Sequence, residues 1–161
     1  NIHSPLDTYL TELDTTNKGD VLIKDMFTHR AKLKPWIPFY LETVKRRRPL
    51  SKFYSKYEND DFSIKVANNL FLKNDYADSI WRKIEASDLR LRREYRYSDL
   101  GMILMGRTVH EIAKKPVNEF AHECFYGPLC LQTTTYKPLE KHSKIIKKYL
   151  SLGTLKHKNF I

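Results

Sequence analysis

The sequence is poor in glycine, cysteine and long apolar runs, and each shortage removes a class of protein. Glycine occurs five times in 161 residues and β-branched runs are few, so helix signals dominate the chain. The two cysteines, Cys124 and Cys130, are fewer than a disulfide-stapled secreted domain carries, which favours a reduced, intracellular protein. No run of about 18 apolar residues is present, which excludes a membrane-spanning helix.

Motifs of enzymes and cofactor sites are also missing. The sequence has no phosphate-binding loop, no Gly-x-Ser-x-Gly and no dinucleotide fingerprint. His122, Cys124, Cys130 and His142 do not have the Cys-x2–4-Cys spacing of structural zinc sites. We therefore expect a protein that is not an enzyme and that holds neither a cofactor nor a metal.

The composition that remains is that of a folded, strongly basic chain. Hydrophobic residues make up 41% and aromatic residues 12%, which predicts a packed core. Because the first residue is not Met, we expect a piece excised from a longer protein. We predict a single helical domain over residues 1–161, with a tail at 154–161.

The pattern predicts a mainly α fold of about eight short helices. Proline at a helix start recurs, as at Pro5 and Pro138, and Leu6, Tyr9, Leu10 and Leu13 then follow helical spacing. At most one short strand or hairpin is expected, near residues 129–136, where Thr is frequent.

Residues 97–115 predict a helix-turn-helix. Gly101 supplies the small residue of a first helix, Gly106 permits a turn, and Thr108 with Glu111 forms a capping box for a second helix. The stretch resembles helix-turn-helix modules in general, which implies that the second helix enters the major groove of DNA. Arg107, His110 and Lys114 would then face the bases.

The excess of positive charge predicts the kind of partner that the protein binds. Lys and Arg total 29 against 19 acidic residues, a net charge of +10, which favours nucleic acid, and DNA in particular. No membrane partner is expected, and the localisation predicted is nuclear. The predicted nucleic-acid-binding residues are Lys45, Arg46, Arg47, Arg48, Arg90, Arg92, Arg93, Arg96, Arg107, His110, Lys114 and Lys115.

Two alternatives remain open at this point. The first is a protein-interaction domain of a chromatin, transcription or replication assembly, which would dock through Trp36, Phe39 and Tyr40. The second is a metal-dependent nuclease that uses Asp60, Asp61 and Lys65. The oligomeric state is left open.

Overall fold

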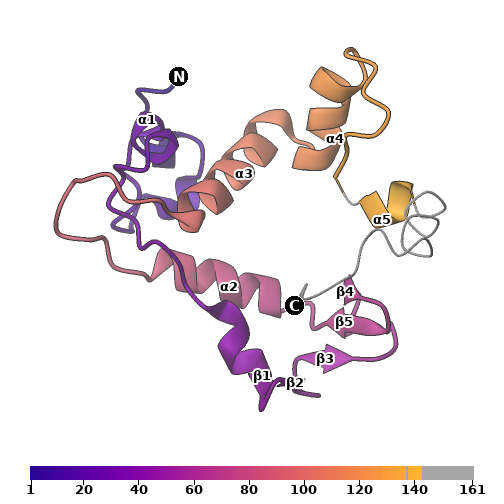
Figure 1. Cartoon of the computed structure of the whole chain (residues 1–161). Helices are drawn as coiled ribbons and strands as arrows, with labels where there is room; N and C mark the ends of the chain where they lie inside the picture. Colours follow the sequence, from indigo (N-terminus) through magenta and orange to yellow (C-terminus); the bar gives the residue numbers. More distant parts are fainter. Residues whose placement is uncertain (137, 143–161) are drawn as a thin grey trace. The chain divides into compact units, whose positions relative to one another are not determined.

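A computed structural model describes residues 1–136 and 138–142. The chain divides into two compact units, Asn1–Thr108 and Val109–Ile161. Figure 1 shows the elements of both units, and each unit is described below by itself.

The core of the first unit begins with short helical turns at the start of the chain. Two 3-10 turns, η1 (Leu6–Thr8) and η2 (Thr11–Leu13), are followed by the helix α1 (Ile23–Phe27). Together these segments bury apolar side chains that form one cluster with Leu33, Ile84, Leu100 and Leu104. The spacing that predicted one helix over residues 5–13 therefore identified buried leucines but not the conformation, which is two separate turns.

Two longer helices close over this core. The helix α2 (Tyr76–Glu85) buries Tyr76 and Ile84, and Trp81 packs against the cluster. The helix α3 (Asp99–Ala113) buries Leu100, Leu104 and Thr108, which are spaced i, i+4, i+8 and therefore share one face. Figure 1 shows the first turns of α3 beside α1.

Two small antiparallel sheets complete the first unit. After the 3-10 turn η3 (Phe39–Thr43), strands β1 (Val44–Lys45) and β2 (Arg48–Pro49) form a hairpin. Strands β3 (Tyr54–Ser55), β4 (Ile64–Ala67) and β5 (Leu70–Leu72) form a second sheet in the order β3-β5-β4. The sequence after Asp61 predicts a helix that ends near Asn74. This prediction is wrong, because the segment forms the β4–β5 hairpin.

A buried lysine joins the beginning of the chain to the end of α2. Lys18 is fully buried, and its Nζ donates to the backbone oxygens of Glu85 at 3.0 Å and Ser87 at 2.5 Å. A third hydrogen bond, of 2.7 Å, goes to Asn17 Oδ1. All three ammonium donors are satisfied, and a cation at the C-terminal end of a helix is favoured by the helix dipole. Burial nevertheless lowers the pKa of Lys18 from its ordinary value.

The regular elements in the described part of the second unit are helices. The helix α4 (Val117–Ala121) continues into a π-helical turn, His122–Tyr126, which ends at Gly127. The sequence of residues 116–127 predicts a helix that ends at Gly127, and these elements confirm it. The helix α5 (Pro138–Lys141) begins at the expected proline. The tail expected at 154–161 lies outside the described residues.

The mainly α prediction is wrong. The described residues form a mixed α/β structure with five strands in two antiparallel sheets. Conversely, residues 129–136, where a strand or hairpin was expected, contain no strand. The five strands are short, and four of them contain charged or polar residues, so they lack the long β-branched runs by which strands are recognised.

The helix-turn-helix prediction for residues 97–115 is also wrong. The helix α3 runs without a break through Gly106. Thr108 does not begin a second helix, because its hydroxyl donates to the oxygen of Leu104 at 2.9 Å inside the same helix. The buried stripe that continues from Leu104 to Thr108 keeps both sides of Gly106 on one face. Burial along that stripe outweighs the tendency of glycine to break a helix.

No helix within the described residues has the length and apolar character needed to cross a membrane.

Candidate functional site around Tyr97

Two segments far apart in the sequence lie side by side next to the start of α3. The backbone N–H of Arg90 donates to the oxygen of Lys32 at 2.6 Å, and that of Arg96 donates to the oxygen of His29 at 2.9 Å. The connection between α2 and α3 is therefore fastened at both ends to residues 29–32. We call residues 90–96 the arginine loop.

Tyr97 and His29 meet where this loop enters α3. Their ring centroids are 4.6 Å apart, and the Tyr97 side chain is exposed. His29 Nδ1 accepts a hydrogen bond of 3.3 Å from the backbone N–H of Ser98, which fixes the imidazole from one side. Tyr95 adds an edge contact with His29 at 6.0 Å. An imidazole, the group most often used in general acid–base catalysis, and a phenol, which can serve the same purpose, are thus in contact at a position open to solvent.

The start of α3 is held rigidly to the segment that follows α1. Ser98 is buried, and its hydroxyl donates to the oxygen of Lys34 at 2.7 Å. The backbone N–H of Asp99 donates to the oxygen of Pro35 at 2.9 Å. These two bonds place Tyr97 on a fixed support, which a functional side chain needs.

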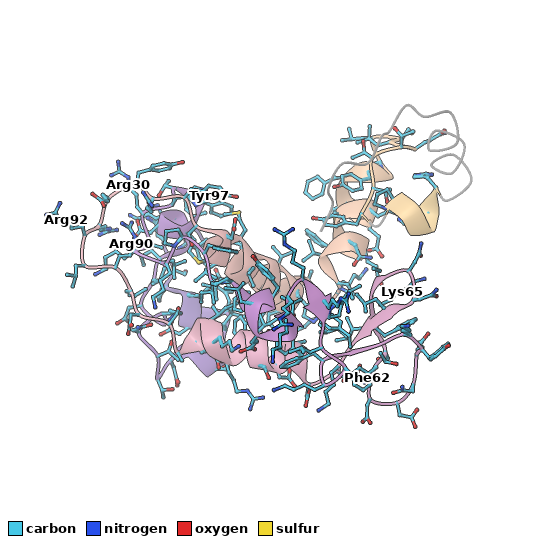
Figure 2. All side chains as sticks on the ribbon, turned by 60° about the horizontal axis from the view of Figure 1, so that its bottom comes forward. Arg30, Phe62, Lys65, Arg90, Arg92 and Tyr97 are labelled. Atoms are coloured by element: carbon cyan, nitrogen blue, oxygen red, sulfur yellow. The ribbon has the colours of Figure 1, made fainter. Side chains whose placement is uncertain are left out.

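Charged side chains border a pocket of about 310 Å³ beside the arginine loop. Arg30, Lys32 and Arg93 line it together with the carboxylates Asp20 and Asp25. Arg93 forms an ion pair with Asp25, which raises the pKa of the Arg93 guanidinium. Figure 2 shows Arg30, Arg90, Arg92 and Tyr97 together at one end of the first unit, away from Phe62 and Lys65.

The predicted nucleic-acid-binding residues fall on three separate places. Lys45–Arg48 form the tip of the β1–β2 hairpin, where Arg46 and Arg47 both have positive φ, of 50° and 62°. Arg90, Arg92, Arg93 and Arg96 belong to the arginine loop. The third place is the end of α3 and the residues after it, which contain Arg107, His110, Lys114 and Lys115.

The basic residues at the end of α3 are engaged within the chain. Arg107 pairs with Glu12 at 3.0 Å, Lys114 with Glu111 at 2.9 Å and Lys115 with Glu123 at 2.5 Å. His110 Nδ1 lies 2.9 Å from the oxygen of Lys115. Such ion pairs and hydrogen bonds within the chain are the contacts expected if these basic side chains have a structural role.

The residues of the two alternative hypotheses are also scattered. Trp36 and Tyr40 are both more than half exposed, with ring centroids 6.3 Å apart, whereas Phe39 packs against the core. Asp60, Asp61 and Lys65 are exposed around the β4 strand. Within residues 1–136 and 138–142, no cluster of His, Cys, Asp and Glu is arranged to hold a metal ion.

A second pocket, of about 480 Å³, lies in the second unit. His122, Cys130 and His142 line it, so three of the residues considered above for zinc do come together. Both cysteines are free and exposed.

Sequence reasoning missed His29 and Arg30 altogether, and it treated Tyr97 only as part of a basic stretch. No local motif marks them, because His29 and Tyr97 are brought together by folding across 68 positions of the chain. The one feature of the sequence that indicated this site was the high density of arginine and tyrosine in residues 90–97.

Comparison with known proteins gives partial likenesses, and no family model matches the chain. Over 57 residues the chain is 35% identical to the N-acetylmuramyl-L-alanine amidase of Bacillus subtilis strain 168, which covers 35% of this chain and 13% of the amidase. The crystal structure of a "putative beta-lactamase" from Bacteroides dorei DSM 17855 superimposes on 86% of this chain with a TM-score of 0.57 and 17% sequence identity. The chain spans 33% of that protein.

These findings overturn the prediction of a DNA-binding domain. The fold is similar to that of a protein described as a "putative beta-lactamase", and the sequence likeness is to an amidase. The helix-turn-helix that carried the DNA prediction is one continuous helix. The excess of positive charge therefore needs a different account.

Proposed function

We propose that this chain is part of a hydrolase of amide bonds whose substrates are related to peptidoglycan. The observation that carries the proposal is the agreement of two separate comparisons, one by sequence and one by structure. One protein is named for cleaving the amide of N-acetylmuramyl-L-alanine, and the other for cleaving a lactam, which is a cyclic amide. This replaces our initial expectation that the chain is not an enzyme.

The chain is proposed to supply one side of an active site. The printed sequence contains neither Ser-x-x-Lys nor Lys-Thr-Gly, two motifs that β-lactamases and penicillin-binding proteins use. What it does contain is Tyr97, exposed, on a fixed support and in contact with His29. We assign to these two side chains the transfer of a proton to or from the amide that is cleaved.

The test measures hydrolysis of N-acetylmuramyl-L-alanine by the longest natural protein that carries these residues. A chromogenic β-lactam is the second substrate. Product is measured by mass spectrometry, and the 161-residue chain is examined in parallel for binding of the same molecules by NMR. Tyr97→Phe should lower the rate by about a hundredfold, the range of general acid–base catalysis.

Tyr57→Phe is the matched control, because Tyr57 is 78% exposed and lies in the segment between β3 and β4. It should leave the rate unchanged. The proposal is wrong if neither substrate is cleaved or bound by a protein whose melting curve shows that it is folded. It is also wrong if the two tyrosine variants behave alike.

A further inference from the structure

The arginine loop and residues 29–32 carry more positive charge than their acidic neighbours neutralise. Six cationic side chains belong to the two segments: Arg30, Lys32, Arg90, Arg92, Arg93 and Arg96. Three carboxylates accompany them, Asp20 and Asp25 at the pocket and Glu94 in the loop. The excess of three positive charges lies within one small region of the first unit.

Internal ion pairs use only part of this charge. Arg90 pairs with Glu94 at 3.2 Å, and Arg93 pairs with Asp25. Within residues 1–136 and 138–142, no ion pair is formed by Arg30, Arg92 or Arg96, and all three are exposed. Guanidinium groups bind carboxylates with two parallel hydrogen bonds, which makes an exposed, unpaired arginine group a receptor for such anions.

The pocket gives this charge a defined place. Its volume of about 310 Å³ lies at the lower end of the range for small-molecule sites. Arg30 and Arg93 both line it, one from each segment, and Val21 and Leu89 add apolar surface. A ligand with a carboxylate and a small apolar group matches this lining.

The backbone on either side of Arg30 is held in an unfavourable conformation. His29 and Lys32 have φ of 54° and 58°, a left-handed region that residues other than glycine rarely adopt. Such strain persists only where surrounding structure enforces it, and it concentrates at functional sites. Here the carbonyls of both residues accept backbone hydrogen bonds from Arg90 and Arg96, and Arg30 between them lines the pocket.

His29 is a neighbour of both Arg30 and the proposed catalytic Tyr97. It immediately precedes Arg30 in the chain, and its ring centroid lies 4.6 Å from that of Tyr97.

We infer that the arginine loop together with Arg30 forms a binding site for the carboxylate of an N-acylated amino acid or short peptide. The inference rests on the proposed function and specifies its substrate class, namely an anionic amide rather than a neutral one. The guanidinium group of Arg30, which lines the pocket, binds the carboxylate, the exposed Arg92 adds positive charge from the arginine loop, and Tyr97 lies toward the amide.

The test compares two ligands that differ only in charge, N-acetylmuramyl-L-alanine and its C-terminal carboxamide. Affinities for the 161-residue chain are measured by NMR titration at about 50 and 200 mM salt, because screening weakens exposed charge interactions over this range. The acid should bind about tenfold more tightly than the carboxamide, the effect of one charge-assisted hydrogen bond. The difference should shrink at the higher salt concentration.

Variants then locate the effect. Arg30→Gln should remove most of the tenfold preference and Arg92→Gln a smaller part of it, and both should leave the affinity for the carboxamide unchanged. Arg30→Lys should retain part of it, which separates loss of charge from loss of fold. Arg48→Gln is the matched control, because Arg48 is an exposed arginine of the β1–β2 hairpin in the same unit.

The inference is overturned if acid and carboxamide bind equally, or if Arg48→Gln reduces the preference as much as Arg30→Gln does. If acid and carboxamide bind equally, binding of the carboxamide would still shift the NMR signals of Tyr97. The proposed hydrolase would then stand, but its anionic substrate class would not. Failure of both ligands to bind would overturn the inference and count against the proposed function as well.

Discussion

The guanidinium carbon of Arg107 lies 4.0 Å from the centroid of the Trp81 indole ring, so the end of α3 is fastened to α2. The same side chain donates from Nε to Glu12 at 3.0 Å. Arg107, which the sequence predicted to read DNA, thus connects α3 with α2 and with the turn η2.

Arg107→Ala should destabilise the protein by about 1 to 2 kcal/mol, because a stacked cation on tryptophan and one half-exposed ion pair are both lost. Arg107→Lys should lose less, since the charge remains but the planar stack does not. Chemical denaturation followed by tryptophan fluorescence measures both changes. Arg48→Ala serves as control and should change the stability by less than about 0.5 kcal/mol. Equal losses for Arg107→Ala and Arg48→Ala would contradict the assignment.

Gly106 and Gly19 should respond to alanine in opposite ways. A Cβ at Gly106 meets nothing within 4 Å, and the residue lies inside α3, so Gly106→Ala should stabilise by about 0.5 to 1 kcal/mol. A Cβ at Gly19 would lie 2.9 Å from the oxygen of Leu13, so Gly19→Ala should destabilise. Urea denaturation measures both. If Gly106 were the turn of a helix-turn-helix, the first substitution would destabilise instead.

Substitutions at the tip of the β1–β2 hairpin should increase the stability of the protein. Arg46 and Arg47 connect the two strands, and both have the positive φ that hairpin turns of type I′ require. Asparagine and glycine adopt this conformation with less strain, so Arg46→Asn/Arg47→Gly should stabilise by on the order of 1 kcal/mol. Lys45→Gly, which places glycine in a strand, should instead destabilise. A thermal melt that ranks the two variants in the reverse order would refute this account of the turn.

Alkaline pH should weaken the fold through Tyr76. This residue is buried, and its hydroxyl donates to the oxygen of Phe39. Burial, with a hydrogen bond to Glu42, raises the pKa of Tyr76 above its ordinary value of 10.0. The folded state therefore holds the proton more tightly than the unfolded state, so this contribution is complete below about pH 10 and is lost progressively above it.

Tyr76→Phe is the variant that isolates this effect. It should cost about 1 kcal/mol at neutral pH, the net value of one hydrogen bond. The difference in unfolding free energy between wild type and variant should then narrow as the pH rises above about 10. Urea denaturation at a series of pH values measures it. A difference that stays constant across the series would show that Tyr76 does not carry this pH dependence.

Helical periodicity in the sequence was informative where burial and conformation coincide. The spacing of Ile80, Trp81 and Ile84 predicts one side of a helix, and α2 does place these residues in or against the core. At Gly106 the local turn signal was misleading, because the buried stripe of α3 on either side of it was the stronger determinant.

Strands were missed for a different reason. Residues 64–67 alternate Ile and Val with Lys, and Asn69 has a positive φ of 51° at the turn into β5, so a hairpin signal was present there. The β1–β2 hairpin had no such signal, because arginines occupy a turn that normally carries asparagine and glycine. The site around Tyr97 depends on contacts between residues 29–32 and 90–97, which no local pattern can reveal.

Lys18 has a consequence for the design of shorter versions of this protein. Its ammonium group is bonded to carbonyls that lie 67 and 69 positions further along the chain. A truncation that began after Lys18 would remove this donor together with the buried core residues Leu6, Leu10 and Leu13. The first eighteen residues thus belong to the packing around the end of α2, and useful fragments of this unit must keep them.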